Sequence, residues 1–253
     1  MKVELLHSTP LDIASKAIRK CWDSGEKSDS YEGTKCPACN EMYEHPEDEC
    51  CANCGSSNYF NVTVCGEDDK ALIEKIGNKY KHSSTLEHLV YNFELTGVSR
   101  AFLQENSRHR IASPSVKSTR YTLKELQSAI LGTAYHPNFE IIEQYIVLPP
   151  LELYRDEDAM IIHHNFLARQ LIDFKESRNG MSNDIWKYGL PECYKTELVM
   201  TINARSLQNY LSLRTSSSAL WEIQKVARAM FESLPQDHKY LFEHCLPNLD
   251  ETE

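Results

Sequence analysis

The sequence contains no apolar run that approaches the ~20 residues of a membrane-spanning helix. Its N-terminus, MKVELLHSTP, lacks the long apolar core of a secretory signal peptide. The glycine-rich fingerprint of dinucleotide-binding loops, GxGxxG, is missing as well. From these absences we expect a cytoplasmic protein with no membrane partner and no nucleotide-binding loop of the glycine-rich kind.

Composition and charge narrow the class of protein further. The 253 residues are 41% hydrophobic and 25% charged, which predicts one large domain, or one domain with a small insert. The net charge of -10 argues against a protein that coats nucleic acid, although it does not bear on a free nucleotide as substrate.

Residues 23–59 contain no Val, Leu or Ile, so this segment cannot build a hydrophobic core of its own. It carries two CxxC pairs with eleven residues between them. Two such pairs close a tetrahedral zinc site of the structural kind. We predict a zinc ribbon over residues 30–60, inserted in a domain of residues 1–253. Its ligands are Cys36, Cys39, Cys51 and Cys54, and Cys50 could compete with them.

Other interpretations of the cysteine segment are chance thiols in a loop, or a redox dithiol, which would need a thioredoxin-like context that is missing. A ribbon that reads nucleic acid is disfavoured, because its acidic residues would repel phosphate. These residues are Glu41, Glu44, Glu47, Asp48 and Glu49. A non-catalytic interaction protein that uses the ribbon remains an alternative.

Residues 108–122, RHRIASPSVKSTRYT, form a basic stretch in this acidic protein. Arginine binds phosphate oxygens through two parallel hydrogen bonds, and hydroxyl groups donate to the remaining oxygens. We therefore expect a phosphate-binding loop with a turn at Pro114, the alternative being a solvated basic loop. The contributing side chains are Arg108, Arg110, Lys117, Arg120, Ser113, Ser115, Ser118 and Thr119.

Hydrophobic periodicity predicts strands at residues 3–7, 60–65, 89–95 and 141–150. It predicts helices at residues 10–22, 67–80, 99–107, 123–131, 156–175 and 202–223, the first of them capped by Thr9. The 156–175 helix should turn Ile162 and Phe166 inward. Its adjacent His163 and His164 cannot easily share a metal ion, because neighbouring helical side chains point about 100° apart.

Two motifs resemble those of the flavin-dependent thymidylate synthases. The first is Arg108-His109-Arg110, then seven residues, Ser118 and Arg120-Tyr121. The second lies in residues 202–223 and contains Asn203, Arg205, Asn209, Arg214 and the pair Trp221-Glu222. His82, Ser84, Glu87 and His88 also match the histidine, the serine or threonine and the Glu-His pair of that family. The resemblance covers most of residues 1–22 and 60–230 and leaves the cysteine segment outside.

The resemblance implies an α/β (α+β) fold of the flavin-dependent thymidylate synthase type, assembled as a homotetramer that binds FAD where subunits meet. The implied reaction is the methylation of dUMP to dTMP, with methylenetetrahydrofolate as carbon donor and NADPH as reductant. The residues implied for FAD are Ser84, Arg108, His109, Arg110, Asn203, Arg205 and Asn209, with His82 and Glu87 near the folate or the flavin and His88 left open. The residues implied for the pyrimidine nucleotide are Glu105, Ser118, Thr119, Arg120, Lys187 and Arg214.

Arg214 is the predicted catalytic residue, because a guanidinium beside the pyrimidine ring stabilises the negative charge that develops when its 5-position reacts. Ser118 has no base in the sequence to activate it, so we assign it to substrate binding. Cys193 lacks the basic context that would lower its pKa, and we expect catalysis without a cysteine.

Four residues depart from the family pattern: Glu105, Val116, Lys187 and Ser218 stand where relatives carry a glutamine, a polar residue, an arginine and a histidine. The departures leave UMP or dCMP open as the substrate, and a hydroxymethyl group as the product. We expect Lys187 to pair with Glu105 beside the phosphate; alternatively, Glu105 faces a sugar hydroxyl or a base amino group.

Overall fold

The computed structural model describes residues 1–36, 42–43, 54 and 60–247. The protein divides into two units. The first unit contains Met1–Glu4, Phe93–Met200 and Arg214–Met230, and the second contains Leu5–Asn92, Thr201–Leu213 and Phe231–Glu253. Among the described residues, no helix is both long and apolar enough to cross a membrane.

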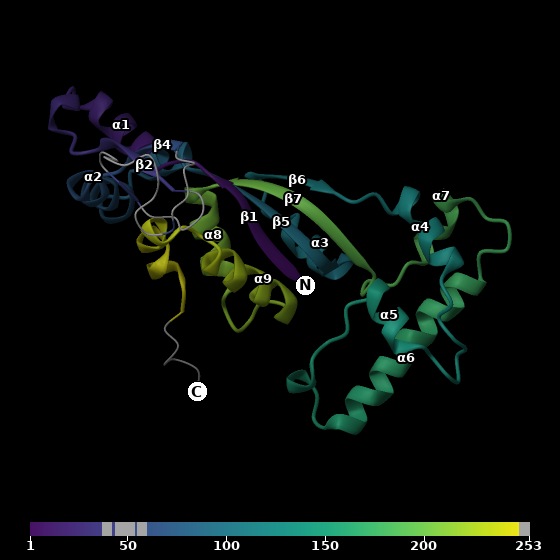
Figure 1. Ribbon diagram of the computed structural model, residues 1–253. Coiled ribbons are helices and arrows are strands. Elements are labelled where there is room, and N and C mark those ends of the chain that lie inside the picture. The colour runs from purple at the N-terminus through teal and green to yellow at the C-terminus, as the bar shows by residue number, and fades with distance from the viewer. Residues whose placement is uncertain (37–41, 44–53, 55–59, 248–253) are drawn as a thin grey trace. The chain divides into compact units, whose positions relative to one another are not determined.

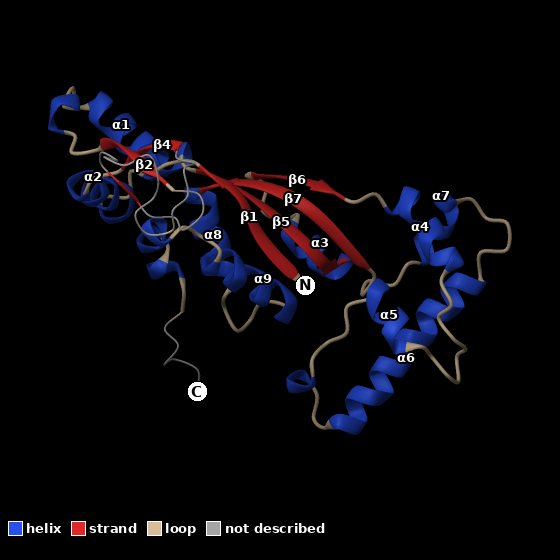
Figure 2. Ribbon diagram, viewed as in Figure 1, coloured by secondary structure: helices blue, strands red, loops and turns tan. Residues whose placement is uncertain are grey.

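A four-stranded sheet, red in Figure 2, has the strand order β1-β5-β7-β6. Its strands are β1 (Lys2–Ser8), β5 (Val90–Ser99), β7 (Lys195–Asn203) and β6 (Ala112–Val116). Side chains alternate between buried and partly exposed along β5 and β7, as expected where one face is covered. The edge position of β6 explains why it tolerates Pro114, which cannot donate to a ladder. The predicted turn at Pro114 is therefore wrong.

A second sheet in the second unit has the order β3-β2-β4. Strand β2 (Tyr31–Lys35) pairs antiparallel with β3 (Met42–Tyr43) and with β4 (Phe60–Val64). The pairing of β2 with β4 runs from Tyr31 opposite Val64 to Lys35 opposite Phe60. The two strands that flank the cysteine segment thus pair with each other along their whole length, so the two ends of that segment lie side by side.

The second unit also contains α1 (Asp12–Cys21), α2 (Glu67–Ile73) and a π-helical segment, Glu74–Lys79. The buried carboxylate of Asp69 joins α1, α2 and the segment before β2. It accepts hydrogen bonds from Arg19 Nε at 2.5 Å and from the hydroxyls of Ser28 and Ser30 at 2.6 Å each. Because Ser30 directly precedes β2, its hydrogen bond to Asp69 anchors the start of the second sheet.

The first unit has a core of its own, formed by α4 (Thr119–Ser128), α5 (Phe139–Tyr145), α6 (Glu157–Glu176) and α7 (Asn183–Trp186). In Figure 1, α5 runs beside the long α6, with which it is in contact. Phe174 of α6 stacks on Trp186 of α7 with ring centroids 4.4 Å apart, and Trp186 Nε1 donates to the Phe174 carbonyl at 2.8 Å.

The remaining α-helices are α3 (Arg100–Asn106), α8 (Ala204–Arg214) and α9 (Trp221–Glu232). Short 3-10 turns occupy Gly25–Lys27, Ser83–His88, Leu151–Leu153, Lys187–Gly189, Gln236–Leu241 and Glu243–Cys245.

Most predicted elements are confirmed, and the exceptions have local causes. Residues 141–150 do not form a strand, because Asn138 caps α5 by accepting from Ile141 N, and Ile142 is buried on that helix. Thr9 does not cap α1; its hydroxyl bonds to the backbone of Val90. The predicted 202–223 helix starts instead as the end of β7, with α8 and α9 after it.

Helix α6 agrees with the prediction in its bounds, and Asp156 caps it by accepting from Ala159 N at 2.8 Å. However, Ile162 and Phe166 are exposed, so their predicted inward orientation is wrong. His163 and His164 have separate partners, the Tyr154 hydroxyl and the Pro149 carbonyl.

Candidate functional site

Helix α3 ends just before the Arg-His-Arg motif, and Glu222 of α9 binds the N-terminus of α3. Ser99 caps α3 by accepting from Phe102 N at 3.0 Å. The buried carboxylate of Glu222 accepts in turn from Ser99 N at 2.7 Å and from the Ser99 hydroxyl. Burial raises the pKa of Glu222, and the two hydrogen bonds from Ser99 oppose this shift. Glu222 of the second motif therefore holds the N-terminus of α3, the helix that precedes the Arg-His-Arg motif.

At the other end of α3, Glu105 of this helix meets one residue from each motif, His109 and Arg214. Arg214 Nη1 donates to Glu105 Oε2 at 2.8 Å, and Arg214 Nη2 donates to the Glu105 carbonyl at 3.1 Å. Arg214 Nε donates to His109 Nε2 at 2.8 Å. The Arg214 side chain is only 13% exposed, so this guanidinium is held away from bulk water.

The contact with Arg214 determines the protonation of His109. An Nε2 atom that accepts a hydrogen bond carries no proton, so the imidazole is neutral with its proton on Nδ1. Burial and then the charge of Arg214 lower the pKa of His109 to about 4. His109 is therefore an uncharged member of the motif at neutral pH.

The N-terminus of α4 presents Ser118, Thr119 and Arg120. Ser118 occupies the cap position, and its hydroxyl makes no capping hydrogen bond. Arg120 forms a two-point ion pair with Asp184 of α7, through Nε to Oδ1 at 2.5 Å and Nη2 to Oδ2 at 3.1 Å. Asn183 Nδ2 donates to the Arg120 carbonyl at 2.7 Å. The start of α7 thus holds both the side chain and the backbone of Arg120.

Lys187 follows α7 directly, and its ammonium lies 5.9 Å from the ring centroid of Tyr188. The ion pairs of Glu105 among the described residues are with Arg214 and, at 3.4 Å, with Arg108. The predicted pairing of Lys187 with Glu105 is therefore wrong. Arg214 at the end of α8 reaches Glu105 instead.

In the second unit, α8 and the turn Ser83–His88 bring together predicted flavin residues. Arg205 Nη1 lies 2.6 Å from Glu87 Oε1, in an exposed ion pair. Asn203 accepts from Ser206 N at 2.8 Å and so caps α8. His82, Ser84 and Asn209 are not buried, so each is accessible to a ligand.

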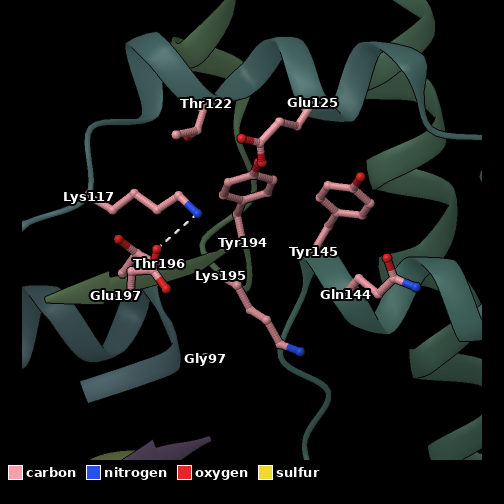
Figure 3. Close-up of a pocket in the computed structure, with 10 residues that line it drawn as sticks. All are labelled: Gly97, Lys117, Thr122, Glu125, Gln144, Tyr145, Tyr194, Lys195, Thr196 and Glu197. Carbon is pink, nitrogen blue, oxygen red and sulfur yellow. Dashed lines mark ion pairs between the residues drawn. The ribbon is translucent and has the colours of Figure 1, made fainter. Parts of the chain in front are cut away.

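A cavity of about 300 Å³ lies in the first unit (Figure 3). The Lys117 ammonium pairs with Glu197 Oε1 at 3.0 Å in its wall. Burial raises the pKa of Tyr194, also in the wall, to about 12. Lys117 is engaged with β7, so its predicted part in binding phosphate has no support in this geometry.

The cysteine ligands lie partly outside the described residues. Cys39, Cys51 and Cys50 are among the residues that are not described. The sulfur atoms of Cys36 and Cys54, one from each CxxC pair, are 3.6 Å apart.

Comparisons with known proteins place the sequence in a family. The family model described as thymidylate synthase complementing protein matches residues 4–238. A flavin-dependent thymidylate synthase of Campylobacter jejuni (strain RM1221) is 46% identical over 249 residues, covering 97% of this chain and 98% of the relative. The chain belongs to the flavin-dependent thymidylate synthase family.

Two comparisons with Helicobacter pylori, one of sequence and one of structure, agree with this assignment. The flavin-dependent thymidylate synthase of strain ATCC 700392 / 26695 is 42% identical over 253 residues, covering 97% of this chain and 99% of the relative. A crystal structure of thymidylate synthase X from Helicobacter pylori with FAD and dUMP has a TM-score of 0.73 and 42% identity, covering 98% of this chain and 100% of that protein's. The chain thus has the α+β fold of a flavin-dependent thymidylate synthase and is a methyltransferase of that class.

For this flavin-dependent thymidylate synthase, sequence reasoning missed the carboxylate partners of the arginines. Asp184 and Asn183 belong to no motif, and only their place at a helix start, after Ser182, could have drawn attention to them. The pairing of Glu105 with Arg214 joins residues that are 109 positions apart, and no local pattern signals it.

Proposed function

We propose that this protein methylates dUMP to dTMP, with FAD as redox cofactor, methylenetetrahydrofolate as carbon donor and NADPH as reductant. The observation that carries the proposal is the guanidinium of Arg214, which is withdrawn from water and held by Glu105 and His109. Such a fixed, desolvated cation suits the negative charge that develops on a pyrimidine ring as its 5-position attacks. The relatives named above, and the FAD and dUMP in the Helicobacter pylori structure, support the same reaction.

We assign the phosphate of the nucleotide to the N-terminus of α4. Backbone N–H groups in the first turn of a helix attract anions, and α4 starts without a cap from the Ser118 hydroxyl. Ser118 and Thr119 add hydroxyls, and Arg120 adds a guanidinium that Asp184 holds in place. We place Lys187 at the same end, as a second cation carried by the segment that holds Arg120.

The residues assigned to FAD fit a cofactor with a pyrophosphate and a polar ring edge. Arg108 and Arg110 are exposed cations on the motif of the first unit, and neutral His109 can bind without adding charge. Ser84, Asn203, Arg205 and Asn209 of the second unit supply hydroxyl, amide and guanidinium groups, with His82 and Glu87 beside them. When bound, FAD supplies the hydride, while these side chains bind and orient it.

We propose that the protein assembles as a homotetramer. Leu151, Leu153, Ile161, Ile162 and Phe166 are exposed large apolar side chains within a short part of the first unit. A concentration of exposed apolar side chains is typical of an interaction surface. Contact with another copy of the protein would explain why Ile162 and Phe166 of α6 face outward.

The reaction is tested with the purified protein. We expect an absorbance spectrum of bound FAD and release of tritium from 5-labelled dUMP. The same assay with UMP and dCMP checks the alternative substrates that the departures at Glu105, Val116, Lys187 and Ser218 left open. If tritium is released only from UMP or only from dCMP, that nucleotide and not dUMP is the substrate. A colourless, inactive protein would favour the alternative of a non-catalytic interaction protein.

We also propose that Cys36, Cys39, Cys51 and Cys54 bind one structural zinc ion, within the predicted ribbon of residues 30–60. Thiolates about 2.3 Å from a tetrahedral zinc ion lie about 3.8 Å from one another, close to the 3.6 Å between Cys36 and Cys54. The antiparallel pairing of β2 with β4 brings the two ends of the cysteine segment together, as a zinc ribbon requires.

Metal analysis of protein purified without chelator should find about one zinc ion per molecule. Cys36→Ser and Cys54→Ser should lower this content strongly, because a structural site needs its four ligands. Cys21→Ser, which removes an exposed thiol outside the segment, is the control and should keep the metal. Much less than one equivalent in the unmodified protein would contradict the proposal.

Cys193→Ala should keep the activity. Burial raises the pKa of the Cys193 thiol to about 11, so almost no thiolate exists at neutral pH. The assay is tritium release per bound FAD, so that a small loss of folded protein does not count as a loss of turnover. Inactivity of a folded Cys193→Ala variant with bound FAD would show that the thiol takes part in the chemistry.

A further inference from the structure

We propose that Glu105 is a positioning residue, whose side-chain and backbone oxygens together fix the guanidinium of Arg214 for contact with the pyrimidine ring. The proposal rests on the role in catalysis proposed above for Arg214. In this proposal Glu105 holds Arg214 in place, whereas the sequence alone suggested that Glu105 lies beside the phosphate of the nucleotide.

The contacts of Arg214 with Glu105 and His109 use three of its N–H groups and leave two for a ligand. Arginine has five N–H donors, and three of them point to Glu105 Oε2, the Glu105 carbonyl and His109 Nε2. The remaining two belong to Nη1 and Nη2. The carbonyl oxygens of a uracil accept hydrogen bonds, whereas its N3–H group donates, so these two N–H groups suit a carbonyl oxygen on which negative charge develops. The three contacts therefore fix the orientation of the guanidinium, and with it the direction of the two N–H groups that are left for the substrate.

Glu105 supplies two of these three acceptors from a single position. Its carbonyl belongs to the last turn of α3, where carbonyl groups attract cations, and it accepts from Arg214 Nη2 at 3.1 Å besides a longer contact of 3.4 Å with Arg108 N. Its carboxylate is 31% exposed and makes a longer contact of 3.4 Å with the exposed Arg108. The contact with Arg214 is shorter and more buried than the contact with Arg108, so the carboxylate mainly holds Arg214 in position.

The carboxylate also has an electrostatic cost. Its negative charge offsets part of the field of Arg214, which is unfavourable for a group that must stabilise an anion. The position of the guanidinium, and not its charge, is therefore what Glu105 improves. A displacement of about 1 Å in a catalytic group can cost about a hundredfold in rate, which is enough to outweigh a reduced field.

Three variants of Glu105 distinguish the effect of its negative charge from its effect on the position of the Arg214 guanidinium. Glu105→Gln keeps the length of the side chain and an oxygen acceptor but removes the charge. Glu105→Asp keeps the charge but shortens the side chain by one methylene. Glu105→Met keeps the length and removes the acceptor. Glu232→Ala, which removes an exposed ion pair with Lys239, is the control and should behave like the unmodified protein.

The measurements are kcat and KM for dUMP, bound FAD from absorbance, and the midpoint of thermal unfolding. We expect Glu105→Gln to keep kcat and to bind dUMP equally well or better. Glu105→Asp and Glu105→Met should lose about tenfold to a hundredfold in kcat, with bound FAD and unfolding midpoint unchanged. Rescue by glutamine is a result that a merely structural role for Glu105 would not produce.

Two outcomes would overturn the proposal. If Glu105→Asp is fully active while Glu105→Gln is impaired, the charge matters and the position does not. If Glu105→Met has a normal kcat, Arg214 does not need the acceptor. The assigned role of Arg214 is checked separately: full activity of Arg214→Gln would refute that role, whereas an inactive Arg214→Gln beside a normal Glu105→Met would refute the positioning proposal alone.

Discussion

Arg214→Lys is expected to lower kcat about a hundredfold to a thousandfold, although the positive charge is kept. Lysine has one compact ammonium group with three N–H donors, so it cannot make the three contacts of Arg214 with Glu105 and His109 and still donate to a base. The loss should fall on kcat, because the contact that is lost strengthens as negative charge develops on the pyrimidine.

The measurement is steady-state turnover of dUMP, with bound FAD determined in each sample. Arg169→Lys is a matched control, since Arg169 Nε donates to the Ala134 carbonyl at 2.9 Å and neither residue belongs to the proposed site. It should keep kcat. An Arg214→Lys variant with the kcat of the unmodified protein would show that a point charge is sufficient and that the guanidinium geometry is irrelevant.

Asp69→Leu is expected to lower the free energy of unfolding by about 3–5 kcal/mol, because it leaves the buried Arg19 without its counter-charge. Arg19→Met should cost a similar amount by leaving the buried carboxylate. The double variant should cost less than the sum of the two, because neither charge then remains buried alone. Urea denaturation at a fixed protein concentration measures all three.

Glu67→Ala is the control for this series. It removes an ion pair with Lys70 from the same helix, but Glu67 is 88% exposed, so stability should hardly change. Full additivity of the Asp69→Leu and Arg19→Met effects would show that the two residues stabilise the fold independently of their ion pair.

The pH dependence of stability gives a second check on Asp69. Burial by itself would raise the pKa of this carboxyl, but hydrogen bonds from Ser28 and Ser30 and the Arg19 guanidinium lower it below its ordinary value. A carboxyl with a lowered pKa stabilises the fold at neutral pH and loses this contribution as the pH falls below about 4. The stability difference between the unmodified protein and Asp69→Leu should therefore shrink in acid.

Much of the local structure could be predicted from sequence because it depends on short-range chemistry. Amphipathic spacing located α1, α3, α4 and α6, and alternation located β1, β4 and β5. The strand predicted at residues 141–150 failed because its short apolar run suits a buried helix equally well, and contact with α6 decides between the two. For the same reason Ile162 and Phe166 could not be assigned to a face of α6 by periodicity alone.

The sequence by itself determined which chemical groups this flavin-dependent thymidylate synthase has available. The Arg-His-Arg motif, the Asn203 to Arg214 motif and the paired CxxC segments are consecutive or regularly spaced residues, so their functional types could be recognised without coordinates. Only the tertiary structure decided which charges pair. Arg214 reaches Glu105, and Arg120 reaches Asp184, because the fold brings each of these pairs of residues together. Electrostatic partners depend on distances of a few ångströms, and residues that are 64 or 109 positions apart acquire such distances only when the protein is folded.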